Sequence, residues 1–385
     1  MDPRTDRQEA TVPSVSVALA RCDDYSSKTV ERALSTLIET LGGWSRFLHR
    51  GDRVVIKPNL LMPGTEQRPI TTHTQIIRSV FDAVTAEGGQ AKIFDIPGVG
   101  SLRSSAHKLG FADLPLEEDP RYTRWKPVLG PFGEIERVDL EDAVVVNVAK
   151  LKTHGMMGLT LATKNLFGLV KLSQRLEWHL KSGINYDHFA SLLVEIEQHV
   201  KPALNIIDAV VAMEGNGPSS GTARPLRFLA ASSDALSLDA AVCRIIGMNP
   251  LDLAILAAAR KLGIPFDDDP PVLGDPVEPH RIHDFQKVVD LRNNPGRHFG
   301  IPGTRWLHDR LRAWTLSRPA VDEGLCTGCG RCAAVCPMHA IDMGKNKPSI
   351  DLARCIRCFC CQELCPEGAL RVRRGILSRF AWRKR

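Results

Sequence analysis

The apolar positions of residues 14–266 follow two patterns that alternate along the chain. Short runs rich in β-branched residues, such as Arg53–Lys57, predict strands, and stretches with apolar residues every three or four positions predict helices. This alternation is typical of an α/β fold in which a mostly parallel sheet carries helices on both faces. The predicted strands are 14–20, 53–57, 90–96, 143–148, 203–211 and 226–231, and the predicted helices are 27–48, 74–86, 191–200, 235–246 and 251–262.

The composition changes after residue 266. Asp267–Pro279 is rich in Asp and Pro, which indicates an extended linker, and Thr304–Leu316 has the spacing of an amphipathic helix. A segment with many cysteines follows. We therefore predict an N-terminal arm (1–13), an α/β domain (14–266), a linker with an amphipathic helix (267–319), a small α+β domain (320–374) and a basic tail (375–385).

Eight of the eleven cysteines lie in two matching runs of the form Cys-x-x-Cys-x-x-Cys-x-x-x-Cys-Pro. This spacing wraps thiolates around cubane iron–sulfur clusters, with the fourth cysteine of each run bound to the other cluster. Two bare Cys-x-x-Cys pairs also occur in zinc sites, but the repeated third cysteine and closing Cys-Pro favour iron and sulfur. The expected ligands are Cys326, Cys329, Cys332 and Cys365 for one 4Fe–4S cluster and Cys355, Cys358, Cys361 and Cys336 for the other.

Residues 320–374 resemble bacterial two-cluster ferredoxins through these runs. Cys360 lies inside the second run but off the ligand spacing, so we expect it to pack beside the cluster or tune it.

The net charge of +6 comes from the C-terminal tail. Residues 371–385 carry seven basic and no acidic side chains, so the rest of the chain sums to −1 and predicts no nucleic-acid surface. No apolar run approaches the ~20 residues that span a bilayer. The tail is expected to be solvated, to touch an acidic redox partner, or to make weak peripheral contact with an anionic membrane. Free thiolates and the lack of an apolar signal segment predict a cytoplasmic protein.

Polar segments follow directly on several predicted strands. In an open α/β sheet, ligands bind just beyond the carboxyl ends of the strands. The segments are Lys57–Leu60, Thr71–His73, Asp95–Gly98, Lys150–Asn165 and Met213–Pro218.

The text of these segments resembles the family catalogued as domain of unknown function 362, which is often fused to a ferredoxin. The resemblance covers residues 14–265 and rests on IKPNL, TTH, KLKTHGMMGLTLATKNLFG, AVVAMEGNGPSSG and SDALSLDAAVCRIIG. It implies an iron–sulfur protein whose α/β domain has an enzymatic role, and it implies no particular reaction.

The lysines of these segments are the first candidates for a site. Lys57, Lys152 and Lys164 would place ammonium groups at one sheet edge, where they would bind an anionic substrate and lower one another's pKa. The alternative is solvated lysines at strand ends. His154 is a candidate general acid or metal ligand, or a structural histidine.

The remaining candidates are weaker signals. Asn59 and Asn165 are expected to hydrogen-bond substrate oxygens or to cap local structure, and His73 to bind substrate or to cap a helix. Glu214, in a loop rich in Gly and Asn, is a candidate acid/base or a partner for a substrate amine. The chain has no Walker-type GK[ST] motif and no Gly-x-Ser-x-Gly elbow.

Three functions fit these features. In the first, a soluble ferredoxin or reductase feeds electrons through both clusters to a small anionic organic substrate, reduced at a conjugated double bond, with His154 delivering a proton. In the second, the chain is an electron-transfer or redox-sensing module that docks a partner. In the third, the α/β domain is a non-redox racemase or lyase and the clusters are structural. A flavin or an additional metal in the α/β domain stays open. A cleft beside a cluster would favour the first function.

Overall fold

The computed structural model describes residues 16–130, 132–140, 142–182, 185–276, 282–287, 317–344 and 347–373. The predicted N-terminal arm, the predicted amphipathic helix Thr304–Leu316 and the predicted basic tail lie outside the described residues.

A single eight-stranded sheet forms the centre of the α/β domain, in the order β10-β1-β9-β8-β6-β2-β3, with β7 paired to β6. Its long central strands are almost wholly buried, as their apolar composition predicts. A separate hairpin is formed by β4 (Tyr122–Trp125) and β5 (Ile135–Val138). The strands of the sheet are β1 (Val17–Arg21), β2 (Arg53–Pro58), β3 (Gln90–Ile93), β6 (Val144–His154), β7 (Gly158–Thr160), β8 (Leu204–Glu214), β9 (Thr222–Ser232) and β10 (Val272–Gly274).

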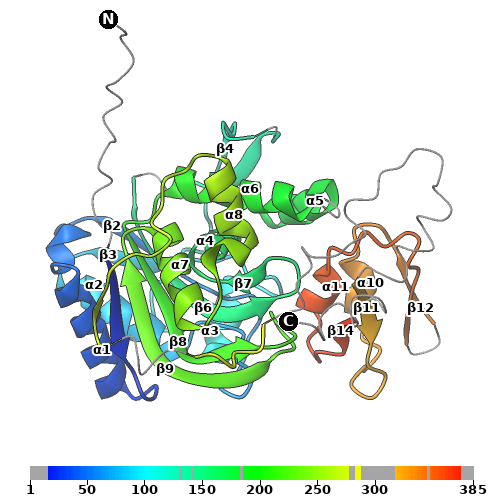
Figure 1. Cartoon of the computed structure of the whole chain (residues 1–385), viewed down its shortest axis with the longest axis horizontal. Helices are drawn as coiled ribbons and strands as arrows, with labels where there is room; N and C mark the ends of the chain where they lie inside the picture. The colour runs from blue at the N-terminus through cyan, green and yellow to red at the C-terminus, as the bar shows by residue number, and fades with distance from the viewer. Residues whose placement is uncertain are drawn as a thin grey trace, which may run out of the picture.

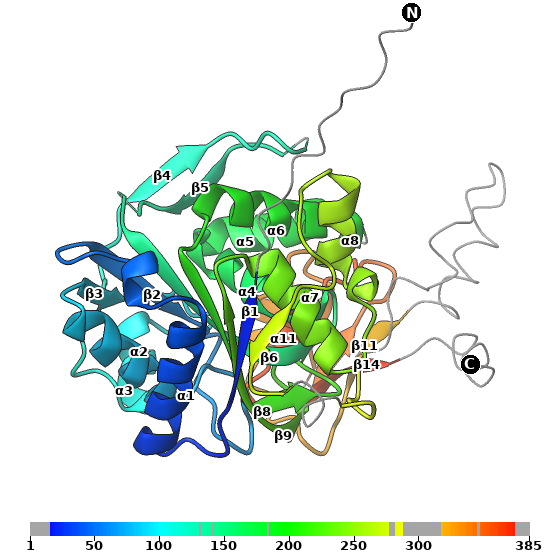
Figure 2. The same ribbon diagram turned by 60° about the vertical axis from the view of Figure 1, so that its left-hand side comes forward.

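Helices cover both faces of this sheet. Figure 2 shows α1, α2 and α3 on one side and α4, α6, α7 and α8 on the other. The helix α1 buries one apolar stripe, formed by Val30, Leu34, Leu37 and Ile38, whereas α7 is buried along nearly its whole surface. The bounds are α1 (Ser27–Thr40), α2 (Thr74–Ala86), α3 (Leu102–Leu109), α4 (Ala162–Asn165), α5 (Leu172–Ser182), α6 (Tyr186–Val200), α7 (Ala235–Ile245) and α8 (Ala254–Lys261).

The α/β class is confirmed, and the sheet is mostly parallel with two antiparallel strands, β9 and the short β7. β9 runs antiparallel to both of its neighbours, β1 and β8, and β7 runs antiparallel to β6. The connection from β8 to β9 spans only residues 215–221. A parallel return would need a crossover of a dozen residues or more, so this short loop can only form a hairpin.

The domain boundary predicted at residue 266 is too early. β10 pairs in parallel with β1 and extends the sheet by one edge strand, and Phe285 is buried in the same core. The start of the predicted linker is therefore part of the α/β domain, because two apolar residues, Val272 and Leu273, are enough for an edge strand of this length.

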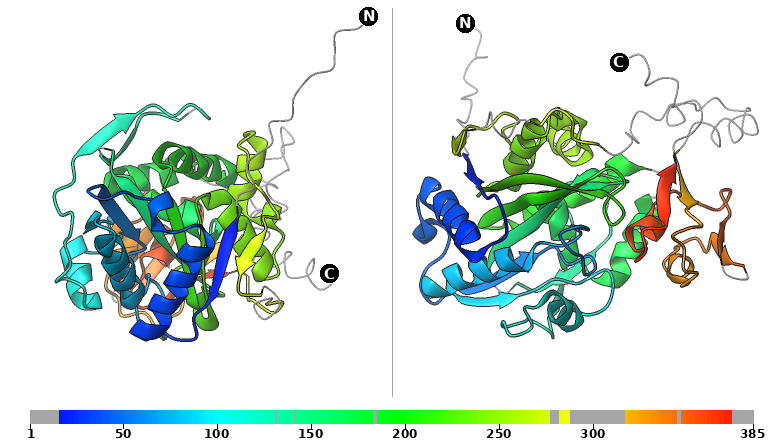
Figure 3. Two further views of the ribbon diagram at one scale, coloured as in Figure 1. Left: turned by 90° about the vertical axis from the view of Figure 1, so that its left-hand side faces the viewer. Right: turned by 90° about the horizontal axis from the view of Figure 1, so that it is seen from below.

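The C-terminal domain is small and built around short elements. β11 (Arg318–Val321) pairs antiparallel with β14 (Leu370–Arg373), and β12 (Ile341–Met343) with β13 (Pro348–Ile350). The helices are α10 (Arg331–Ala334) and α11 (Cys360–Glu363). Figures 1 and 3 show this domain at one end of the molecule, with α11 on the side that faces the α/β domain.

Close contacts join the two domains. Nε2 of Gln362, a fully buried residue of α11, donates to the carbonyl oxygens of Asn216 and Gly217, both at 2.9 Å. Gly98 is needed at the junction, since a Cβ there would lie 2.7 Å from Cδ2 of Leu364. No helix among the described residues is both long and apolar enough to cross a bilayer.

Candidate active site between the two domains

Two small cavities of the C-terminal domain are lined by cysteines. All eight cysteines of the two runs are free thiols. The four that line each cavity are the four that the spacing assigns to one cluster, including the exchanged fourth cysteine, and Cys360 lines neither. Thiolates converging on a compact cavity are the donor set of a cubane cluster, so the residues fit the group. The sets are Cys326, Cys329, Cys332 and Cys365 in one cavity and Cys336, Cys355, Cys358 and Cys361 in the other.

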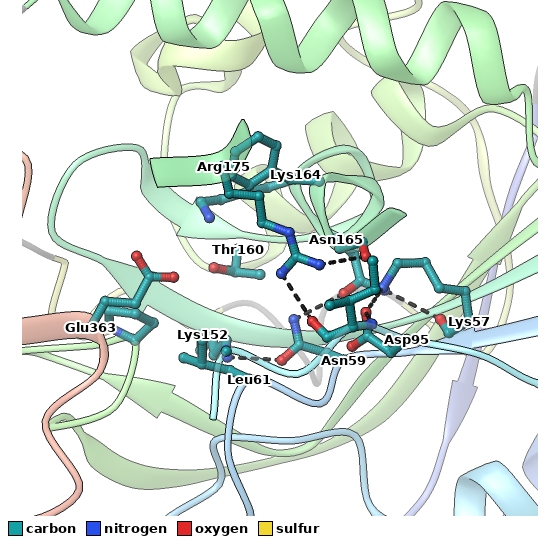
Figure 4. Close-up of a pocket in the computed structure, with 15 residues that line it drawn as sticks. Lys57, Asn59, Leu61, Asp95, Lys152, Thr160, Lys164, Asn165, Arg175 and Glu363 are labelled. Atoms are coloured by element: carbon teal, nitrogen blue, oxygen red, sulfur yellow. Dashed lines mark hydrogen bonds and ion pairs between the residues drawn. The ribbon is translucent and has the colours of Figure 1, made fainter. Parts of the chain in front are cut away.

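A third cavity, of about 60 Å³, lies where the carboxyl ends of β2 and β6 meet α11. One water needs roughly 10–15 Å³, so this space admits several waters or a small organic anion. Figure 4 shows Glu363 entering from the C-terminal domain and facing Lys152 and Lys164 of the α/β domain. The charged and polar lining residues are Lys57, Asn59, Asp95, Lys152, Thr160, Lys164, Asn165, Arg175 and Glu363.

Lys57 is part of the cavity wall and its charge is neutralised. Its Nζ lies 2.9 Å from Oδ1 of Asp95, and Oδ2 of Asp95 accepts from the backbone N–H of Leu60 at 2.7 Å. Gly168 packs against this pair, because a Cβ there would come within 2.3 Å of Asp95. A contact between Lys57 and a substrate, as predicted, would therefore have to replace this buried ion pair with Asp95.

A ladder of buried amides connects the cavity to the centre of the sheet. Asn59 donates to Asn165 at 2.9 Å, Asn165 donates to Asn147 at 2.8 Å, and Asn147 donates to Asn205 at 2.8 Å. The side-chain oxygen of Asn59 in turn accepts from Lys152 at 2.9 Å. Asn59 and Asn165 were predicted to bind substrate or to cap local structure. In the structure, Asn59 accepts a hydrogen bond from Lys152, and Asn165 accepts one from Asn59.

Lys152 has no carboxylate partner among the described residues. Its Nζ donates to the side-chain oxygen of Asn59 and, at 2.7 Å, to the carbonyl oxygen of Ile70. Burial, reinforced by the positive charge of Lys164, lowers the pKa of Lys152 to about 7. The amine is therefore substantially neutral at neutral pH.

Lys164 presents its ammonium group to the same cavity from α4. Asp239 fixes the start of this short helix by accepting from the backbone N–H groups of Ala162 and Thr163, at 2.8 and 3.1 Å. Burial lowers the pKa of Lys164, and the carboxylate of Glu363 opposes this shift. Among the described residues its Nζ has an opposing charge in Glu363 but no hydrogen-bonded partner, so this cation is available to a ligand in the cavity.

His154 stands at the boundary between the domains. Its Nδ1 accepts from the backbone N–H groups of Met156 and Met157, so the ring proton lies on Nε2, directed towards Glu363. Burial, with Lys164 nearby, lowers the pKa of His154 to about 4. The ring is neutral at neutral pH. Although burial opposes the ionisation of Glu363, Lys164 and His154 hold its pKa well below the usual value.

Three predicted site residues do not line the cavity: His154, which lies next to it beside Glu363, and two more distant residues, His73 and Glu214. Nδ1 of His73 caps α2 by accepting from the backbone N–H of Gln75 at 3.2 Å, and its ring stacks on Tyr25. Glu214 ends β8 and accepts from the backbone N–H of Gln286 at 3.0 Å. The predictions that His73 binds substrate and that Glu214 acts on it are corrected, because both side chains serve local structure.

Two charged residues of the cavity were missed. Arg175 reaches it from α5 and donates to the carbonyl oxygens of Ile96 and Gly168, at 2.9 and 2.7 Å. Glu363 lies within the second cysteine run, where the cluster spacing masks any other signal. No motif next to Arg175 or Glu363 in the sequence marks either residue as part of a site.

Comparison with known proteins agrees with this architecture. The family described as "Domain of unknown function (DUF362)" matches residues 54–244, and the family described as "4Fe-4S dicluster domain" matches residues 318–366. The dicluster domain binds 4Fe–4S clusters, which indicates iron–sulfur electron transfer.

A curated relative extends the match. The "Thylakoid-associated protein sll1697" of Synechocystis sp. is 34% identical over 257 residues, which cover 65% of this chain and 80% of that protein. The similarity thus extends over most of the relative's length. The chain belongs to the DUF362 family and carries a C-terminal 4Fe–4S dicluster domain.

Proposed function

We propose that the chain is an iron–sulfur oxidoreductase that reduces a small anionic organic substrate in the cavity between its two domains. The observation that supports it is the position of Glu363. This residue lines the substrate cavity and lies two residues after Cys361, which lines the second cluster cavity. Two residues span at most roughly 7 Å of chain, so the substrate space borders the second cluster.

The charge of the cavity suits an anion. Because Asp95 neutralises Lys57 and the amine of Lys152 is substantially neutral, the remaining cationic side chains are Lys164 and Arg175, against the single carboxylate of Glu363. In a buried site this excess favours a carboxylate or a similar anion. The volume of about 60 Å³ restricts the ligand to a few heavy atoms.

Reduction at a conjugated double bond consumes two electrons and two protons. The clusters, when bound, supply the electrons one at a time. Lys164 and Arg175 bind and orient the anion. The proton donor predicted from sequence was His154, but its low pKa leaves it neutral, and the buried ammonium group of Lys164, whose pKa burial lowers, is the better donor.

Electron entry is assigned to the first cluster. Cys329 is exposed, whereas all four cysteines of the second cavity are buried or half-buried. A soluble ferredoxin or reductase would therefore dock at the first cluster, and the second would deliver electrons to the cavity. The free thiols favour a reducing, cytoplasmic location, where such a soluble donor would be found. The name of the relative refers instead to the thylakoid.

The other two functions explain fewer features of the cavity. A docking module has no use for a cavity lined by buried cations, and a racemase or lyase with structural clusters has no use for one beside a cluster. Each of them stays a distinct outcome of the test below.

The test is anaerobic. Dithionite-reduced protein is mixed with small unsaturated carboxylates, and the rate of cluster reoxidation is followed by absorbance. We expect Lys164→Met to slow reoxidation at least about tenfold, since it removes a buried charge–charge contact worth over 1.4 kcal/mol. Lys108→Met, at an exposed lysine of α3, is the matched control. Equal rates in the Lys164 variant and the wild type, with iron content unchanged, would contradict the proposal.

A further inference from the structure

Three fully buried lysines lie near the centre of the sheet, and they differ in what holds their amino groups. Lys57 pairs with Asp95 at 2.9 Å, and Lys150 pairs with Asp208 at 2.8 Å. Lys152 contacts only neutral oxygens, although it lies on the same strand as Lys150 and is equally buried, each being 1% exposed. Lys152 is also the one of these two that lines the cavity.

The contacts of Lys152 match those of a neutral amine. An uncharged amine has two N–H groups, and Lys152 has two acceptors, the side-chain oxygen of Asn59 and the carbonyl oxygen of Ile70. An ammonium group would have a third donor, which has no acceptor among the described residues. With both N–H groups used, the lone pair of the nitrogen is free to attack a ligand in the cavity.

The amide ladder fixes this geometry. Asn59 donates its N–H to Asn165, so its oxygen is the atom that faces Lys152. Asn165 is held in turn by Asn147. The sheet thereby positions a neutral acceptor for the amine, and no carboxylate among the described residues hydrogen-bonds it.

We propose that Lys152 captures the carbonyl carbon of a small anionic carbonyl compound as a Schiff base. The amine nitrogen forms the new C–N bond, the carbonyl oxygen leaves as water, and the imine gains the proton that makes it an iminium. Lys164, with no bonded partner among the described residues, binds the substrate's carboxylate and supplies that proton. The substrate class rests on the proposed function, because the cationic cavity is its basis.

A Schiff base fits the reduction proposed above. In an α,β-unsaturated carbonyl compound, the iminium draws electron density from the conjugated double bond. Two electrons from the soluble donor, together with two protons, convert the unsaturated iminium into the saturated one. Hydrolysis by one water then releases the saturated carbonyl product and regenerates the amine of Lys152.

Reductive trapping tests the inference without any electron transfer through the clusters. The full-length protein is incubated anaerobically with glyoxylate or pyruvate and cyanoborohydride, which turns a Schiff base into a stable secondary amine. Tandem mass spectrometry then locates the adduct. We expect Lys152 to be labelled at least about tenfold more than Lys150 or Lys57, because burial lowers the pKa of all three lysines but a hydrogen-bonded carboxylate opposes this shift only in Lys57 and Lys150.

Comparing lysines within one wild-type sample avoids any dependence on the folding of a variant. A second measurement follows the labelling from pH 6 to pH 8, where the yield at Lys152 should rise with a midpoint near 7. Lys152→Arg should lose the adduct and leave labelling elsewhere unchanged.

Labelling confined to surface lysines, or equal at Lys150 and Lys152, would overturn the inference. The two proposals also fail separately. Trapping at Lys152 in a protein whose clusters no substrate reoxidises would refute the reductase and leave the Schiff base standing. Full reductive turnover in Lys152→Arg would refute the Schiff base and leave the reductase standing.

Discussion

Nε2 of His154 lies 3.6 Å from a carboxylate oxygen of Glu363, and the two residues belong to different domains. The contact places one negative charge from the cluster domain beside the lysines of the α/β domain. Glu363 is the strongest opposing charge for both Lys152 and Lys164. The protonation of the cavity therefore depends on how the domains dock.

Replacing Glu363 with Gln should make Lys152 reactive at lower pH. Without the carboxylate, burial and the charge of Lys164 lose their strongest opposing charge, and the pKa of Lys152 falls below about 7. The rate of Lys152 acylation, measured against pH by mass spectrometry, reports the midpoint. Glu367→Gln, at an exposed position of the same domain, should leave the midpoint unchanged. An unmoved midpoint in the Glu363 variant would show that the carboxylate does not set the charge of the cavity.

The cluster assignment predicts different effects for two cysteines of the C-terminal domain. Cys329→Ala removes a ligand of one cluster and should lower iron and acid-labile sulfide to about half. Cys360→Ser should retain both, because Cys360 lines neither cysteine cavity. Iron and sulfide analysis of anaerobically purified protein makes the comparison. Full iron in Cys329→Ala would exclude the assigned pairing.

The buried ion pair between Lys57 and Asp95 predicts a double-mutant cycle. Lys57→Met leaves the Asp95 carboxylate buried and unpaired, and should lower the free energy of unfolding by about 3–5 kcal/mol. The double variant Lys57→Met/Asp95→Asn should recover part of this loss, since the unpaired charge is gone. Urea unfolding of all four proteins measures the coupling. Additive losses would mean that the pair is not coupled.

Asp239 predicts a specific dependence of stability on pH. Burial raises its pKa to about 7, although the hydrogen bonds from the backbone N–H groups of Ala162 and Thr163 favour the ionised form. The folded state therefore holds a proton that the unfolded chain releases near pH 4, so this residue's contribution falls as the pH rises from about 4 to about 7. The contribution is at most about 4 kcal/mol.

Asp239→Asn should flatten that dependence, because an amide oxygen still caps α4 but does not titrate. Urea midpoints at pH 5, 6 and 7 for both proteins provide the comparison. Glu197, whose pKa burial also raises to about 7, leaves a residual slope of the same sign. Parallel curves for variant and wild type would refute the assignment.

The features that could be predicted from sequence are those fixed by local chemistry. Cluster ligands must follow one another at set spacings, so the two cysteine runs alone were sufficient to predict the ligands of both clusters. Pro58 ends β2 by its own covalent geometry, and Asp234 caps α7 by accepting from the backbone N–H of Ser237, as its type and position indicate.

The features that could not be predicted depend on partners far along the chain. Lys57, Lys150 and Lys152 look alike in the sequence, and they differ only because Asp95 and Asp208 reach two of them from neighbouring strands. Glu363 enters the cavity because Gln362 docks α11 onto the loop after β8. The direction of β9 was foreseeable from its short connection, and the Gly-rich loop was instead interpreted as a site.

Because α11 supplies one wall of the cavity, the α/β domain alone does not reproduce the site of the whole chain. A fragment ending before residue 317 would keep Lys152 and Lys164 yet lose the counter-charge that restrains them, and its cavity would open to water.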